Sequence, residues 1–149
     1  MKYDFDPVPL SAPDPMGCEE MLLRATQHYE FVSRRRTVRH FSSESISRDV
    51  IQACILTAGS APSGANHQPW HFVCVSDPHI KQQIRRAAQA EERAFYGGKA
   101  GEQWLEDLQG LGTDAQKPFL ETAPWLIAVF AERYSLDPSG VKQKNYYVP

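Results

Sequence analysis

The sequence has few cysteines, no long apolar run and no excess of positive charge. Its three cysteines, Cys18, Cys54 and Cys74, are far apart and form no CxxC pair or Cys/His cluster. This spacing argues against a zinc site or a disulfide framework and predicts buried free thiols in a reducing compartment. No stretch has the apolar length of a bilayer span or the apolar core of a signal peptide. We therefore expect a cytoplasmic protein with no membrane partner.

The charge balance argues against nucleic acid as a partner. The 149 residues include 16 Lys and Arg against 18 Asp and Glu, a formal net charge of −2. A general nucleic-acid binder usually carries a basic excess. A hydrophobic content of 42% is ordinary for a globular protein, and the length suits one domain.

Proline content divides the chain into an N-terminal arm, residues 1–15, and one domain, residues 16–149. Apolar periodicity predicts helices over 18–34, over a segment ending at Gly59, from Asp77-Pro78 to about Tyr96, and in two shorter pieces near 100–110 and 113–122. The second of these helices has Ser45 or Ser47 as its N-cap and a predicted buried face. That face comprises Val50, Ile51, Cys54, Ile55 and Ala58. Residues 70–76 and 123–132 predict two buried strands, so helices alternate with few strands.

Two motifs flank the helix that ends at Gly59. The first, "RRRTVRHF", contains Arg34, Arg35, Arg36, Thr37 and Arg39. It is either a solvated helix end or a phosphate site, because guanidinium groups bind phosphate with paired hydrogen bonds. The second, "SAPSGANHQPW" over residues 60–70, cannot continue a helix. It is either a tight connection or a loop whose backbone and polar side chains face a flat or anionic ligand. Together they suggest a phosphate-bearing planar cofactor.

A third candidate site lies on the helix that starts at Asp77. Ile84, Ala88, Glu92 and Tyr96 recur at four-residue intervals and share one face. With Lys117, the carboxylate and phenol could clasp an amino-acid zwitterion. From spacing alone, a solvated helix end and a surface lysine are the favoured interpretation.

"RRRTVRHF", the following helix and "APSGANHQPWHFVCV" resemble the FMN-dependent nitroreductase family over residues 30–149. The resemblance implies an α+β fold, an α/β/α sandwich with a mixed, mainly antiparallel sheet. It also implies a flavin oxidoreductase that uses FMN, with NAD(P)H as electron donor and with no protein nucleophile or metal. The residues implied in FMN binding are Arg35, Arg36, Thr37, Val38, Arg39, Ser63, Gly64 and Asn66.

"EERAFY", "WLEDL" and "KPFLETAP" resemble the active-site lid of the iodotyrosine deiodinase-like branch of that family. This resemblance implies that Glu92, Tyr96 and Lys117 bind the zwitterion of a halotyrosine, with Ala65 also contacting the substrate. The implied activity is reduction of a small aromatic or amino-acid substrate, including reductive dehalogenation. A general nitro- or quinone-reductase is the alternative within the same family.

Family members are longer than this chain, so we expect the C-terminal part of the family domain to be absent after residue 149. In the family that part supplies a helix of a homodimer. Because this part is expected to be absent, a further alternative stays open: a non-catalytic flavin-binding remnant. The activity of the 149-residue chain has to be measured.

Overall fold

The computed structural model describes residues 9–12 and 14–145. The predicted N-terminal arm, residues 1–15, therefore falls largely outside the described residues, and its boundary stays a prediction. The chain forms two compact units, residues 1–38 and residues 39–149.

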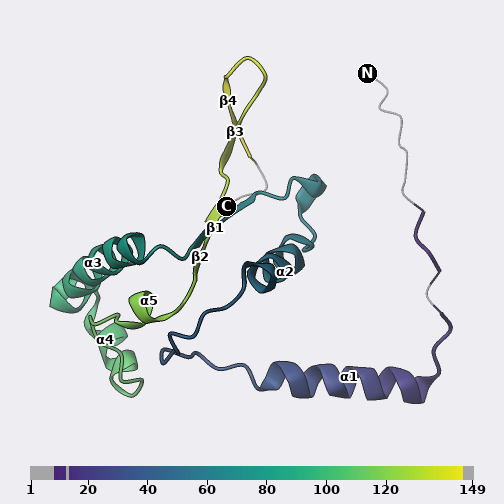
Figure 1. Ribbon diagram of the computed structural model, residues 1–149, viewed down its shortest axis with the longest axis horizontal. Coiled ribbons are helices and arrows are strands. Elements are labelled where there is room, and N and C mark those ends of the chain that lie inside the picture. The colour runs from purple at the N-terminus through teal and green to yellow at the C-terminus, as the bar shows by residue number, and fades with distance from the viewer. Residues whose placement is uncertain (1–8, 13, 146–149) are drawn as a thin grey trace. The chain divides into compact units, whose positions relative to one another are not determined.

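In its described residues, the first unit contains the helix α1 (Cys18–Ser33), as its periodicity predicts (Figure 1). Glu19 and Glu20 occupy its first turn, where acidic side chains favour the positive end of the helix dipole. Arg24 pairs with Glu20 one turn earlier, at 2.6 Å. Both side chains are well exposed, so the pair contributes little stability.

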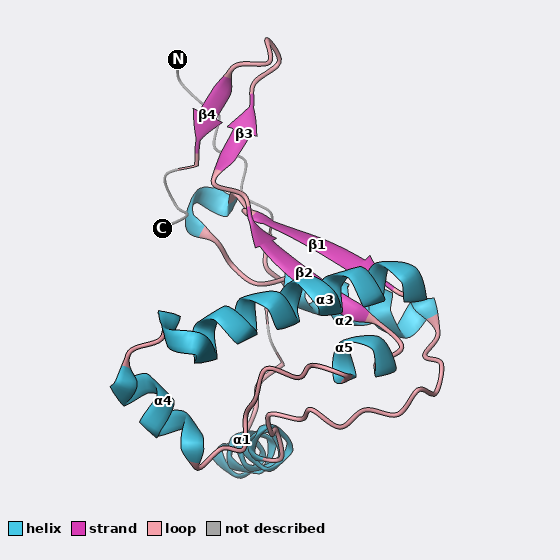
Figure 2. Cartoon of the chain, turned by 90° about the vertical axis from the view of Figure 1, so that its left-hand side faces the viewer, coloured by secondary structure: helices cyan, strands magenta, loops and turns pink. Residues whose placement is uncertain are grey.

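The second unit alternates helices with short antiparallel strands (Figure 2). β1 pairs with β2 from Trp70 opposite Ala131 to Val75 opposite Leu126. β3 and β4 form a separate hairpin. The predicted α+β class and the first two strands are confirmed, whereas this hairpin was not predicted. In chain order the elements are α2 (Arg48–Gly59), β1 (Trp70–Val75), α3 (Pro78–Ala94), α4 (Glu102–Gln109), α5 (Phe119–Thr122), β2 (Leu126–Ala131), β3 (Tyr134–Leu136) and β4 (Lys142–Lys144).

Two predicted helix starts are confirmed by their caps. The Ser47 hydroxyl oxygen accepts from the N–H of Val50 at 3.4 Å and begins α2. Asp77 Oδ1 accepts from the N–H of His79 and of Ile80, at 2.8 and 3.0 Å, and Pro78 follows at the first helical position. Such caps satisfy backbone donors that a helix leaves unpaired.

The predictions of burial are wrong for most of these elements. Ala100 and Ala123 are the buried apolar residues of the described chain. On the predicted inner face of α2, Ile51 and Ile55 are half-buried while Val50 remains 52% exposed. All three cysteines are free but exposed, and β2 is exposed beyond its first residue. A stripe of apolar residues is buried only where a second layer covers it, and the described chain provides little of that layer.

Lys81, at the start of α3, is a charged residue that is buried. Only 6% of Lys81 is exposed, and its ammonium donates to the carbonyls of Glu121 and Ala123, at 3.0 and 2.8 Å. One turn further along α3, Arg85 pairs with the Glu121 carboxylate at 3.2 Å. These contacts fasten α3 to α5, because a buried ammonium is stable only where acceptors replace its water.

The β3–β4 hairpin is closed by Asp137. Its Oδ1 accepts from the Ser139 hydroxyl at 2.6 Å and from the N–H groups of Ser139 and Val141, each at 2.9 Å. The bonds from the Ser139 hydroxyl and the Val141 N–H lower the pKa of Asp137 below its ordinary value of 3.8. The charged carboxylate therefore holds the turn.

Across the part of the chain that the structure describes, no helix has both the length and the apolar character of a membrane span.

Replacing Lys81 with Met should lower the free energy of unfolding by about 2 kcal/mol, because two carbonyls lose a charged donor at a buried position. Arg86→Met, on an exposed position of the same helix, is the control and should change stability by under about 0.5 kcal/mol. Urea unfolding followed by circular dichroism measures both. Equal stability of the two variants would contradict the anchoring role of Lys81.

Acid should open the β3–β4 turn. Because the pKa of Asp137 is lower in the folded hairpin than in an open chain, its contribution is complete above pH 3.8. That contribution is lost as the pH falls through the lowered value. The amide proton shifts of Ser139 and Val141, followed by NMR from pH 6 to pH 2, should move together towards open-chain values. In Asp137→Ala these shifts should be close to open-chain values at every pH.

Candidate functional site

Glu92 and Lys117 lie together beside the end of α3. Glu92 stands in the last turns of α3, and Lys117 precedes α5. Lys117 Nζ is 3.1 Å from Glu92 Oε2, with the two side chains 13% and 34% exposed. Lys117 also donates to the carbonyl of Asp114 at 2.6 Å. The carboxylate and the ammonium are thus paired with each other.

Tyr96, the third residue of the predicted clasp, is held by a different partner. Its hydroxyl donates to Thr113 Oγ1 at 2.9 Å, and both residues are half-buried. The structure therefore brings Glu92 and Lys117 into direct contact and directs the phenol to Thr113. Sequence reasoning missed Thr113. Its only signal was a small polar residue directly after a glycine, at the start of the helical piece predicted near 113–122, of which the structure forms only α5.

The chain leaves α3 through a widened turn. Residues Phe95–Lys99 form a π-helical turn that the Ala100 N–H closes onto the Phe95 carbonyl at 3.1 Å. Gly98 has a φ of 122°, which only glycine adopts easily. Single π-helical turns occur often at functional sites. This turn directs the chain away from the α3 axis and into α4.

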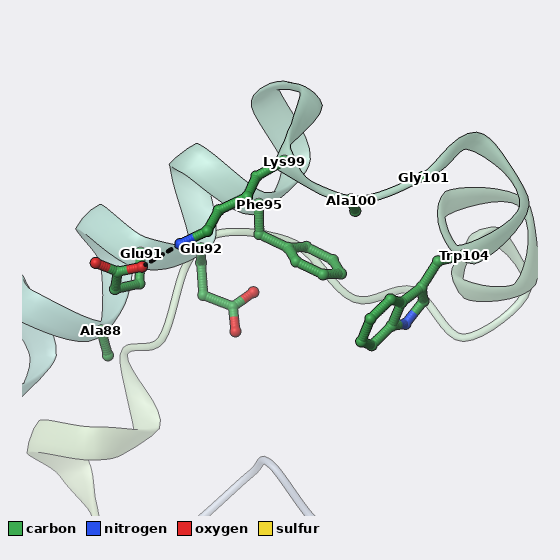
Figure 3. A pocket seen from close by; sticks show the side chains of 8 residues that line it. All are labelled: Ala88, Glu91, Glu92, Phe95, Lys99, Ala100, Gly101 and Trp104. Carbon is green, nitrogen blue, oxygen red and sulfur yellow. Dashed lines mark hydrogen bonds and ion pairs between the residues drawn. The ribbon is translucent and has the colours of Figure 1, made fainter.

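A cavity of about 500 Å³ opens beside this turn (Figure 3). The Phe95 and Trp104 rings meet edge to face, 5.0 Å between centroids, and form its aromatic wall. The Glu92 side chain projects to the same side, while Lys99 reaches Glu91 at 3.2 Å. The size and lining suit a small aromatic molecule that carries a positive group.

The basic motif continues directly from α1. Arg35, Arg36, Thr37 and Val38 end the first unit and are exposed, and Arg39 begins the second. Arg36 Nη1 donates to the carbonyls of Ser33 and Arg35, at 2.6 and 2.8 Å, near the end of the helix. The exposed guanidinium groups and the threonine hydroxyl are donors of the kind that phosphate binds.

The loop after α2 carries left-handed backbone at residues other than glycine. Ala65, Asn66 and Gln68 have φ values of 48°, 53° and 44°. Such conformations cost about 1 kcal/mol or more each, and strain of this kind concentrates at functional sites. The Ser63 hydroxyl oxygen accepts from the Gln68 N–H at 2.8 Å, which leaves its own proton available for a ligand. The donor set suits a flavin ring edge.

Among the described residues, no group of three or more His, Cys, Asp or Glu side chains is arranged to hold a metal ion.

Comparison with known proteins places these features in a family. Residues 32–146 match the nitroreductase family. An iodotyrosine deiodinase of Haliscomenobacter hydrossis is 54% identical over 130 residues, which are 87% of this chain and 59% of that protein. An iodotyrosine deiodinase of Nematostella vectensis is 39% identical over 143 residues, 96% of this chain and 52% of that protein. The chain thus spans little more than half the length of these relatives.

A solved structure supports the same assignment. The crystal structure of oxidized iodotyrosine deiodinase bound to FMN and 3-iodo-L-tyrosine matches with a TM-score of 0.66 at 38% identity, covering 70% of this chain and 56% of that one. An FMN-dependent nitroreductase of Clostridium difficile, at 22% identity and a TM-score of 0.52, supports the fold alone. From these matches and the family match over residues 32–146, the chain belongs to the nitroreductase family.

Proposed function

We propose that this chain is part of an FMN-dependent oxidoreductase that reductively dehalogenates halotyrosine-like amino acids. The observation that carries the proposal is the Glu92–Lys117 pair at the edge of an aromatic cavity. A free amino acid presents an ammonium and a carboxylate on one carbon. Such a molecule can therefore replace the bond between Glu92 and Lys117 by two others. Its ammonium would bind Glu92, and its carboxylate would bind Lys117. Relatives named iodotyrosine deiodinase, up to 54% identical, support this choice of substrate class.

The exchange is energetically accessible. The Glu92 side chain keeps a third of its surface in water, and partly exposed ion pairs contribute on the order of 1 kcal/mol or less. The substrate replaces one ion pair by two. Each charged group keeps a partner throughout, so no uncompensated charge is buried.

The chain offers two sets of donors suited to FMN. In the basic motif, Arg35, Arg36, Thr37, Val38 and Arg39 would bind the phosphate and ribityl chain through side chains and backbone. In the loop after α2, Ser63, Gly64 and Asn66 would approach the flavin ring, and Ala65 would contact the substrate. The exposed guanidinium groups support these assignments, and so does the Ser63 hydroxyl, whose bond to Gln68 does not use its proton.

The reaction replaces a carbon–halogen bond by a carbon–hydrogen bond, consumes two electrons and one proton, and releases halide. When bound, reduced FMN supplies the two electrons. The residues of this chain hold the substrate: Glu92 the ammonium, Lys117 and Tyr96 the carboxylate. Segment 100–112, with α4, would close over the substrate and exclude water.

Three further parts of the proposal rest on the family resemblance and the composition. NAD(P)H is the electron donor, directly or through a reductase. The complete protein is a homodimer, and its location is cytoplasmic. A general nitro- or quinone-reductase is the alternative activity, and the Glu92 variant below separates it from dehalogenation.

Arg35→Gln should weaken FMN binding about tenfold to a hundredfold, because a charge-assisted bond to phosphate is lost. Riboflavin, which lacks the phosphate, should bind the variant and the wild type alike. Quenching of flavin fluorescence on titration with protein measures both affinities. Arg34→Gln is the neighbouring control and should bind FMN as the wild type does. An equal loss of FMN and riboflavin binding in Arg35→Gln would contradict the assignment.

Glu92→Gln should lower kcat/KM for 3-iodo-L-tyrosine about tenfold or more, because the substrate ammonium loses its carboxylate partner. Reduction of a nitroaromatic compound without an amino-acid group should be unchanged. Iodide release with dithionite as reductant measures the first activity. Glu30→Gln, exposed on α1, is the matched control. If Glu92→Gln leaves iodide release intact, or if the wild type reduces only the nitroaromatic compound, the dehalogenase assignment is wrong.

A further inference from the structure

Thr113 is the hydrogen-bond partner of Tyr96 at the site. The two hydroxyl oxygens are 2.9 Å apart, and both residues are half-buried. Thr113 follows Gly112, whose φ of 60° turns the chain back towards α3 after α4. The contact therefore joins the last turns of α3 to the segment that returns from α4, across 17 residues of sequence.

The same turn also orients Lys117. The Asp114 carbonyl accepts from Lys117 Nζ at 2.6 Å, and Asp114 Oδ1 accepts from the Gln116 N–H at 2.8 Å, which fixes the turn. The two residues that would bind a substrate carboxylate, Tyr96 and Lys117, are thus both held by neighbouring residues, Thr113 and Asp114. Glu92, at the ammonium end, is paired with Lys117.

The hydrogen bond between the two hydroxyl groups can change direction. A phenol has a single proton, and Tyr96 donates it to Thr113. If Tyr96 is to donate to a substrate carboxylate, that bond must be given up. A threonine hydroxyl is both donor and acceptor and rotates to suit its partner. Thr113 can therefore reverse the bond and donate to the Tyr96 oxygen.

We infer that Thr113 is a positioning residue for the carboxylate of the amino-acid substrate. It accepts from Tyr96 as the structure shows, and it donates to Tyr96 when the phenol turns its proton to the carboxylate. The chain of two bonds, from Thr113 to Tyr96 to carboxylate, strengthens each bond by polarisation and fixes the phenol at the carboxylate end. This inference rests on the proposed function, since it assumes an amino-acid substrate at Glu92 and Lys117.

The test compares Thr113→Val, which keeps the shape of the side chain but can neither donate nor accept, with Thr113→Ser, which can do both. The ligands are 3-iodo-L-tyrosine and 3-iodotyramine, which differ by the carboxylate alone. Their affinities for the FMN-loaded protein are measured by calorimetry. In parallel, the Cζ chemical shift of ¹³C-labelled Tyr96 in the ligand-free protein reports whether the phenol keeps its partner.

Thr113→Val should weaken binding of 3-iodo-L-tyrosine about fivefold to tenfold and leave 3-iodotyramine within about twofold of the wild type. Thr113→Ser should restore the wild-type affinity for both ligands. The Tyr96 Cζ shift should move in Thr113→Val and return in Thr113→Ser. A purely structural role would weaken both ligands together, so the ratio of the two affinities isolates the positioning role.

The contrary outcomes are distinct. If the wild type prefers 3-iodo-L-tyrosine and Thr113→Val keeps the full preference, the inference about Thr113 is wrong while the proposed function stands. If the valine variant loses affinity for both ligands equally, Thr113 only supports the fold. If the wild type shows no preference for the ligand with a carboxylate, the zwitterion site itself is wrong, and the role of Thr113 is overturned with it.

Discussion

The attachment of α3 to the chain that precedes β2 is the interaction on which the candidate site depends. Lys81 provides it, because its buried ammonium binds two backbone carbonyls at the end of α5. Glu92 and Tyr96 lie on or just beyond the same helix, and Lys117 lies a few residues before α5. A helix is rigid over this length, so fixing its start also fixes the distance at which its end meets Lys117. In a chain with few buried side chains, this one anchored helix gives the site its geometry.

The site is organised so that its charges and hydroxyl groups have partners before a ligand arrives. Glu92 pairs with Lys117, and Tyr96 pairs with Thr113. A charge or hydroxyl left alone at a half-buried position would be costly, and pairing avoids this cost. Under the proposed function, the same pairing would set the selectivity, because a ligand that supplies only one of the two charges leaves the other group of the pair without a partner. An amino acid supplies both.

Much of the secondary structure could be predicted because its determinants are local. The Asp77-Pro78 start and the Ser47 cap require only neighbouring residues, and β1 follows from alternation. Burial could not be predicted in this way, because it depends on which layer covers a face, as α2 shows. The β3–β4 hairpin was missed because its strands have three residues each and its turn is held by Asp137. Glu92 and Tyr96 were predicted as site residues from the family resemblance, since their spacing alone favours a solvated helix end. Thr113 was not predicted, because its contact with Tyr96 forms only when the chain folds back after α4.

The π-helical turn at Phe95–Lys99 has a consequence for protein engineering. Residues 100–112 leave α3 through this turn and return at Thr113, whose hydroxyl meets Tyr96. The two ends of the segment are therefore one hydrogen bond apart, and closure of a loop between fixed ends depends only weakly on its length. Residues 100–112 can therefore be replaced as a unit by other sequences. Sequences of other length or polarity at these positions would change the part of the cavity lining that Ala100, Gly101 and Trp104 form. Helix α3 and the hydrogen bonds of Lys81 would stay as they are.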